Sequence, residues 1–169
     1  MSRAVLSIGS NVGDRLAHLR SVLDRLAKAK AAVVAVSPVY QTAPWGGVEQ
    51  DDFLNAVVIA EAPLEPGAWL RLGQECERAA GRERAERWGP RTLDVDVVDV
   101  DGASLDEPEL TLPHPRAHER AFVLVPWLDA DPDATLPGLG SVAWLVAGLP
   151  ASERAGMHRR DDLSLRDGS

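Results

Sequence analysis

The sequence has a single cysteine, Cys76, and no apolar run that approaches the roughly 20 residues needed to cross a membrane. One cysteine excludes a disulfide bond within the chain. The first residues also lack the apolar segment and the small-residue cleavage site of a secretory signal. Together these absences favour a cytoplasmic protein.

Basic residues are outnumbered, since 18 lysines and arginines stand against 26 aspartates and glutamates, which leaves a net charge of −8. A nucleic-acid backbone or an anionic membrane requires a basic face, so neither is an expected partner. Tyrosine and phenylalanine are also scarce, with one tyrosine and two phenylalanines. A sheet that binds single-stranded nucleic acid stacks bases on aromatic side chains, so this function ranks last among the alternatives.

The 169 residues have the length and composition of one globular domain, with 45% hydrophobic and 26% charged residues. Alternating apolar residues and β-branched runs predict four strands, at residues 3–8, 32–36, 53–60 and 92–100. Val39 and Tyr40 are expected to continue the second strand as an edge, beyond Ser37 and Pro38. Apolar residues at helical spacing predict helices at residues 14–30, 67–80, 121–128 and 141–147.

The order of these elements is β-α-β-β-α-β, followed by an added helical C-terminal portion. This is the order of the ferredoxin-like fold, an α+β architecture. It predicts an antiparallel sheet with both main helices on one face, and it leaves the other face for loops, the C-terminal portion or a ligand. We assign residues 1–150 to a single domain and residues 151–169 to a polar, loosely held tail.

Two aspartates, Asp94 and Asp96, lie two positions apart in the predicted fourth strand. Residues at this spacing point to the same side with Cα atoms ~6.5 Å apart, so both carboxylates can bind the same hard cations. Val95 and Val97 then point into the core with Leu93. A solvated strand face is the alternative, because an Asp-x-Asp pair alone is a weak signal.

Four arginines, Arg82, Arg84, Arg87 and Arg91, come just before this pair. Residues 94–109 hold seven acidic residues and no lysine or arginine. A basic loop that leads into an acidic strand suits a magnesium–polyphosphate complex, because guanidinium groups bind phosphates and carboxylates bind the metal. Salt bridges between the two segments are the alternative.

Three aromatic residues, Trp45, Phe53 and Phe122, are candidates for stacking on a flat ring. Trp45 lies in a loop rich in proline and glycine, where burial is not obligatory. Asn55 interrupts an apolar strand, and its amide can both donate to and accept from the edge of a heterocycle. For each aromatic residue, packing in the core is the alternative.

Other motifs favour structural roles. Residues 9–11, Gly-Ser-Asn, precede a helix but match neither G-x-x-x-x-G-K-[ST] nor G-x-G-x-x-G, so we interpret them as a structural turn. His114 and His118 are four apart, but Pro115 between them argues against a zinc-binding pair on one helix. Cys76 lies on the apolar side of a predicted helix, which favours an inert core residue.

Longer segments add a resemblance to these local signals. They are LSIGSNVGDR at residues 6–15, SPVYQTAPWGGVEQDDFLNAVV at 37–58, GRERAERWGPRTLDVDVV at 81–98 and LTLPHPRAHERAFVLVPW at 110–127. With these segments the chain resembles the 6-hydroxymethyl-7,8-dihydropterin pyrophosphokinase family. The resemblance implies a ferredoxin-like fold and an enzyme of folate biosynthesis. Such an enzyme moves the β,γ-pyrophosphoryl group of ATP to the hydroxymethyl oxygen of the pterin and releases AMP.

The resemblance also implies roles for individual residues, among them Asp94 and Asp96 as ligands of two Mg²⁺ ions. The pterin pocket is formed by Thr42, Ala43, Pro44, Trp45, Phe53, Asn55 and Phe122. The residues around ATP are Gln74, Glu77, Trp88, Arg91, Thr111, His114 and Arg120. The catalytic residues are Arg82, Arg84, Arg91, Asp94 and Asp96. Trp88 and the arginines of residues 82–87 belong to a loop that closes over the nucleotide.

The substrates implied by the resemblance are ATP and the pterin, and we expect a monomer without nucleic-acid or membrane partners. A non-catalytic ferredoxin-like module that senses a ligand is the main alternative function. Such a module would explain the order of elements and the aromatic residues. It has no need for Asp94 and Asp96 beside four arginines.

Overall fold

A computed structural model describes residues 1–43, 51–81 and 92–166. In these ranges six strands form the main sheet, in the order β10-β3-β4-β1-β5, with β2 also paired to β4. All of these pairs are antiparallel. The strands are β1 (Ser2–Ser10), β2 (Ala32–Val36), β3 (Val39–Thr42), β4 (Phe53–Ala62), β5 (Asp94–Val100) and β10 (Met157–Arg160).

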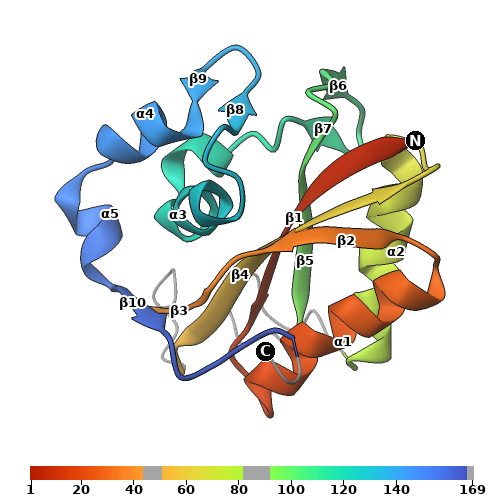
Figure 1. The fold of residues 1–169 in the computed structure, drawn as a ribbon, viewed down its shortest axis with the longest axis horizontal. Coiled ribbons are helices and arrows are strands. Elements are labelled where there is room, and N and C mark those ends of the chain that lie inside the picture. The colour runs from red at the N-terminus through yellow and green to blue at the C-terminus, as the bar shows by residue number, and fades with distance from the viewer. Residues whose placement is uncertain (44–50, 82–91, 167–169) are drawn as a thin grey trace.

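Two helices of 14 residues, α1 (Arg15–Lys28) and α2 (Pro66–Ala79), pack on one face of the sheet. Helix α3 (Ala121–Ala130) lies on the other face, as Figure 1 shows. No helix among the described residues is both long enough and apolar enough to cross a membrane. The remaining elements are β6 (Leu105–Asp106), β7 (Thr111–Leu112), η1 (Ala117–Glu119), β8 (Thr135–Leu136), β9 (Gly140–Ser141), α4 (Val142–Ala147) and α5 (Ala151–Ala155).

The predicted ferredoxin-like order is confirmed, with β3 continuing β2 along the same partner strand, β4. Ser37 bridges the break between the two: its N–H donates to the Val57 carbonyl at 2.9 Å, and its Oγ accepts from the Val57 N–H at 2.8 Å. Pro38 follows and has no N–H to donate to a partner strand. The prediction that this continuation is a sheet edge is wrong, because β10 pairs with the outer side of β3.

The larger hydrophobic core lies between the sheet and the two long helices. Leu19 and Leu26 of α1 are fully buried in it, while Leu16 and Leu23 pack at its margin, as the helical spacing predicts. Cys76 of α2 is buried there too, and burial raises the pKa of its thiol to about 11. The thiolate is therefore scarce at neutral pH, in agreement with an inert core cysteine.

The second core lies between the opposite face of the sheet and α3. Val57 and Ile59 of β4 and Val98 of β5 pack there against Trp127 and Leu124 of α3. The face that the sequence left open is therefore covered in this part by the C-terminal portion of the chain.

The prediction of a loosely held tail after Pro150 is wrong. Residues 157–160 form β10 along β3, and Leu165 is 3% exposed within the larger core. Farther along, the Ser164 carbonyl accepts a hydrogen bond from Arg20 Nε at 2.9 Å. An outer strand with unpaired backbone groups is a site for pairing with other chains, and this segment covers it.

Candidate active site

A row of residues crosses the sheet in register. Asp94 of β5 lies opposite Gly9 of β1, and Gly9 lies opposite Asn55 of β4. Asn55 in turn lies opposite Tyr40 of β3. Adjacent strands are ~4.8 Å apart, so the backbones of Asp94 and Asn55 are about 10 Å apart with only a glycine between them. The row brings the predicted metal-binding strand close to the predicted pterin pocket.

The aspartates project from the face of the sheet that α3 packs on. Val95 and Val97 of β5 are buried in the core beneath α1 and α2, and Leu93 is buried with them as the alternation predicts. Because side chains alternate along a strand, Asp94 and Asp96 point to the opposite face, where both are partly exposed.

Gly9 is a site residue that the sequence reasoning missed. Strand β1 runs through Gly9 and Ser10, so the predicted structural turn at these residues is wrong. A Cβ built on Gly9 would lie under 3.0 Å from Oδ1 of Asn55, closer than real Cβ atoms come, and 3.5 Å from Cδ1 of Phe53. Alternation could have extended the strand to Gly9, but only the register shows that the Asn55 side chain fills this space.

Asn55 is 5% exposed, and its Nδ2 donates a hydrogen bond to Oγ1 of Thr42 at 2.6 Å. Thr42 is buried as well, while Phe53 is partly exposed and Ala43 is exposed. The bond to Thr42 holds the buried Asn55 side chain in place, and an amide offers both a donor and an acceptor to a ligand. The structure thus brings Thr42, Phe53 and Asn55 together as the resemblance implies.

Tyr40 continues the row beyond Asn55 and connects β3 to α3. Its hydroxyl donates a hydrogen bond to the carboxylate of Asp129, an exposed residue of α3. Burial, and then the Asp129 carboxylate, raise the pKa of Tyr40 to about 12. The hydroxyl therefore stays protonated at neutral pH and keeps donating to Asp129.

Glu77 of α2 holds the backbone of β5 between the two aspartates. Its carboxylate accepts a hydrogen bond from the Val95 N–H at 3.0 Å, and Glu77 is buried. In the described part of the sheet β5 is the outermost strand on its side, so this N–H points away from β1. Gln74 lies one turn earlier on α2 and is partly exposed. Glu77 thereby fixes the strand segment that carries Asp94 and Asp96.

Arg120, at the start of α3, adds positive charge near the aspartates. Burial lowers the pKa of Arg120, while Asp96 and Asp94 both raise it, which reflects their attraction to the guanidinium. An arginine stays charged in proteins, so the group remains a cation. Its Cζ lies 5.5 Å from the ring centroid of Phe122, within the range of a cation–π contact. The predicted ATP residue Arg120 and the predicted pterin residue Phe122 therefore touch.

His114 lies between β7 and η1, beside the outer side of β5. Its backbone N–H donates to the Val98 carbonyl at 2.9 Å, and its Nδ1 accepts from the Arg116 N–H at 3.2 Å. Burial, and then the charges of Arg120 and Arg116, lower the pKa of His114 to about 4. The imidazole is therefore neutral at pH 7, with its proton on Nε2. Thr111, another predicted ATP residue, pairs with Asp106 in the β6–β7 hairpin.

The donor chemistry of Asp94 and Asp96 fits magnesium. In phosphate-binding sites Mg²⁺ is held through one or two carboxylates, with phosphate oxygens and water as its other ligands. Within residues 1–43, 51–81 and 92–166 there is no cluster of three or more His, Cys, Asp or Glu side chains that could hold a metal ion. His118, which stands four residues after His114, has its Nε2 3.6 Å from Oε1 of Glu119.

Several predicted site residues lie outside the described ranges. They are Pro44, Trp45, Arg82, Arg84, Arg87, Trp88 and Arg91.

Comparison with known proteins identifies the family. The family model described as 7,8-dihydro-6-hydroxymethylpterin-pyrophosphokinase matches residues 5–132. The chain belongs to this family. A 2-amino-4-hydroxy-6-hydroxymethyldihydropteridine pyrophosphokinase of Mycobacterium bovis is 53% identical over 91% of this chain and 87% of its own length. The enzyme of the same name from Mycobacterium leprae is 54% identical over 98% of this chain and 92% of its own.

Solved structures with the same fold are also known. One described as an HPPK-DHPS in complex with substrates matches with a TM-score of 0.71 at 10% sequence identity. The match covers 94% of this chain and 46% of that one, so this chain spans about half the length of the solved chain. At this low identity the match supports the fold alone, and it confirms the predicted α+β architecture.

Membership of the pyrophosphokinase family confirms the predicted activity. The chain is an ATP-dependent transferase of folate biosynthesis that acts on small molecules. A ligand-sensing module without catalysis and a nucleic-acid-binding module therefore lose their support as alternatives.

Proposed function

We propose that the β,γ-pyrophosphoryl group of ATP passes to the hydroxymethyl oxygen of 6-hydroxymethyl-7,8-dihydropterin across the row Asn55–Gly9–Asp94, and that AMP leaves. The strand register supports this path, because only Gly9 separates the amide from the carboxylate. In-line transfer requires both substrates to be held next to one another in the correct orientation. Because Gly9 has no side chain, the Asn55 amide can lie over it, close to the strand that carries the aspartates.

On the pterin side, we assign recognition to Asn55 and stacking to Phe53 and Phe122. The buried amide of Asn55, fixed by Thr42, suits the donor and acceptor pattern of a heterocycle edge. Aromatic rings suit its flat faces. The other residues assigned to this pocket are Ala43, Pro44 and Trp45, the last two from the family resemblance alone.

On the metal side, we assign Mg²⁺ binding to Asp94 and Asp96, with two ions as the resemblance implies. Bound metal ions would neutralise phosphate charge and support the entering and leaving oxygens. Arg120 lies in the field of both carboxylates and can bind phosphate oxygens beside them.

For ATP binding, we assign roles to Glu77 and His114 from their places beside β5. Glu77 acts through the backbone of β5, and His114 donates from Nε2 because its imidazole is neutral. The other residues assigned to ATP are Gln74, Trp88, Arg91, Thr111 and Arg120. Arg82, Arg84 and Arg91, assigned from the resemblance, would neutralise the transferring group.

The proposal further includes a cytoplasmic monomer with its catalytic domain at residues 1–150. Most of the buried core residues of both cores come from this range. Leu165 also belongs to the larger core, so residues 151–166, the described part of the C-terminal segment, act as part of the same folded unit. Light scattering of the purified protein measures the oligomeric state.

The experiment that tests the reaction mixes the purified protein with Mg²⁺, ATP and 6-hydroxymethyl-7,8-dihydropterin and separates the nucleotides. We expect AMP in an amount equal to the pterin pyrophosphate. We expect Asp94→Asn and Asp96→Asn to lose Mg²⁺-dependent AMP formation, while Asp106→Asn, a matched change at an exposed residue of β6, retains it. Release of ADP would refute pyrophosphoryl transfer, and near-normal activity of Asp94→Asn would refute the metal assignment.

A further inference from the structure

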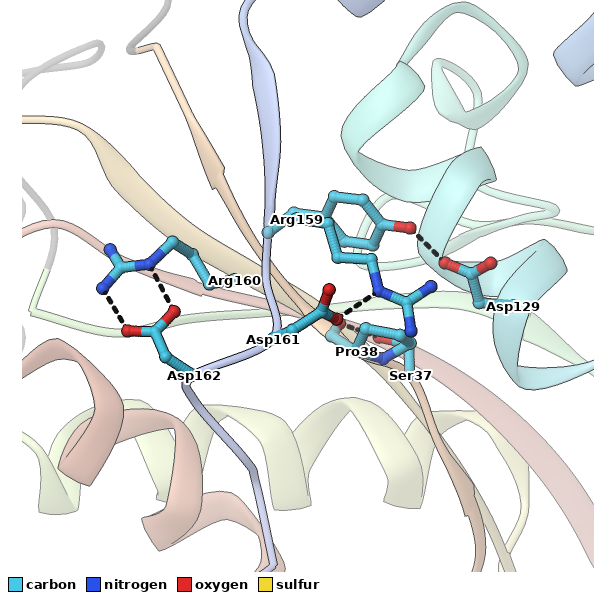
Figure 2. Close-up of polar contacts among 8 residues, drawn as sticks. Ser37, Pro38, Asp129, Arg159, Arg160, Asp161 and Asp162 are labelled. Atoms are coloured by element: carbon cyan, nitrogen blue, oxygen red, sulfur yellow. Dashed lines mark hydrogen bonds and ion pairs between the residues drawn. The ribbon is translucent and has the colours of Figure 1, made fainter.

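The C-terminal strand β10 presents an arginine with a fixed orientation. Asp162 binds the Arg160 guanidinium with both carboxylate oxygens, at 2.9 Å to Nε and 2.8 Å to Nη2 (Figure 2). This fork leaves Nη1, which donates a hydrogen bond to Oε1 of Gln41 at 2.6 Å. The neighbouring pair, Arg159 with Asp161, is separate and more exposed. Arg160 is thus held for a single further contact, to β3.

Gln41 connects Arg160 to Asp52, and we call these three residues the relay. Its Nε2 donates to Oδ2 of Asp52 at 3.0 Å. Two further side chains hold the same short segment, since Arg15 donates to the Asp52 carbonyl at 3.0 Å and Asn11 donates to the Asp51 carbonyl at 2.9 Å. Asp52 directly precedes Phe53, the first residue of β4.

The relay lies behind the pterin pocket. Gln41 stands between Tyr40 and Thr42 in β3, and side chains alternate, so Gln41 projects from the face opposite to Thr42 and Asn55. That opposite face is the one on which α1 packs, and β10 lies beside β3 there. The relay therefore holds the strands that carry the pocket without entering the pocket.

The amide of Gln41 makes this relay depend on Arg160. A glutamine amide has one acceptor oxygen and one donor NH₂ group, and a half-turn flip of the amide exchanges their positions. Arg160 can bind only the oxygen, because a guanidinium has no acceptor. With Arg160 in place the NH₂ group must face Asp52. Without Arg160, the Gln41 oxygen loses its donor and Asp52 alone holds the amide, so the side chain that joins β3 to Asp52 is less constrained.

We propose that Arg160 is a positioning residue for the pterin site, acting through Gln41 and Asp52 on Phe53 and Thr42. This inference rests on the proposed pterin pocket. Arg160 itself lies beyond residues 5–132, the part of the chain that the family model matches.

The test measures KM for the pterin, KM for ATP, kcat and thermal stability for three variants. Arg160→Ala removes the orienting donor. Gln41→Glu keeps an acceptor for Arg160 but puts a second carboxylate against Asp52. We expect both to raise the pterin KM about threefold to tenfold, with ATP KM and kcat within about twofold of the wild type. Arg154→Ala removes a charge from exposed α5 in the same C-terminal segment and should leave all four quantities unchanged.

Conservative replacement gives a further readout. Arg160→Lys keeps the charge but cannot form the fork to Asp162 and the bond to Gln41 together, so its pterin KM should lie between those of the wild type and Arg160→Ala. A lower melting temperature with an unchanged pterin KM in Arg160→Ala and Gln41→Glu would overturn the proposal and leave a structural role only. Failure of the wild type to form AMP would instead overturn the proposed function. In that case, unequal pterin binding by wild type and Arg160→Ala in calorimetry would still support the relay, and equal binding would overturn it.

Discussion

Replacing Gly9 by alanine tests the geometry of the row across the sheet. The new methyl group would lie under 3.0 Å from Oδ1 of Asn55. Asn55 cannot give way cheaply, because it is buried and its Nδ2 is bound to Thr42 at 2.6 Å. We therefore expect the Asn55 side chain to move and the pterin affinity to fall.

The size of the effect follows from two terms. Overpacking of a well-packed site destabilises the fold by about 1–3 kcal/mol. Loss of the buried hydrogen bond between Asn55 and Thr42 adds about 1 kcal/mol. Misplacing the recognition amide should weaken pterin binding by a similar amount, and each 1.4 kcal/mol is about tenfold in Kd.

The assay combines urea unfolding with calorimetric titration of the pterin. Gly148→Ala is the matched control, because a Cβ on Gly148, at the end of α4, would lie 3.7 Å from its nearest neighbouring atom, an ordinary contact. We expect Gly148→Ala to leave pterin affinity unchanged. Unchanged pterin affinity in Gly9→Ala would refute the reasoning.

A double-mutant cycle separates the clash from other effects of the methyl group. In an Asn55→Ala background the clashing oxygen is gone, so Gly9→Ala should destabilise the protein much less there than in the wild type. Equal destabilisation in both backgrounds would show that the Asn55 side chain is not what excludes a side chain at position 9.

Two further predictions concern the outer side of β5. Glu77→Ala leaves the Val95 N–H without its acceptor and should lower the free energy of unfolding by about 1–3 kcal/mol, whereas Glu75→Ala, at an exposed position of α2, should change it little. For His114, the folded pKa of about 4 lies below the ordinary value of 6.5, so the unfolded chain binds more protons in this interval. The stability contributed by His114 is therefore present above pH 6.5 and lost as the pH falls toward 4. Urea unfolding should show a smaller loss over this range in His114→Gln, and equal losses would contradict the buried neutral imidazole.

The features that could be predicted from the sequence are local ones. The stripe of leucines in α1 and the alternation of Val95 and Val97 with Asp94 and Asp96 depend only on the period of a helix or strand. Such patterns place side chains on a face whatever the rest of the chain does. The order of the elements along the chain then predicts the ferredoxin-like sheet.

The features that could not be predicted depend on pairing between distant segments. The contact of Gly9 with Asn55 follows from the register of β1 and β4, which no local pattern specifies. Met157–Arg160 reads as a polar tail because three of its four residues are basic or histidine. It becomes a strand because β3 offers an edge, and Gln41 offers an acceptor for Arg160. In both cases a tertiary partner decides the structure.

The two sides of the sheet show how stability and the site depend on the same residues. On the side of β5, the Val95 N–H is bound by Glu77 and the Val98 carbonyl by the His114 N–H. On the side of β3, β10 supplies the partner strand and Arg160 supplies the relay to Asp52. Outward-facing backbone groups must be satisfied, or the strand pairs with other chains. Because the segments that satisfy them also hold the aspartates and the pocket, variants on these two sides should be judged by substrate affinity as well as by unfolding.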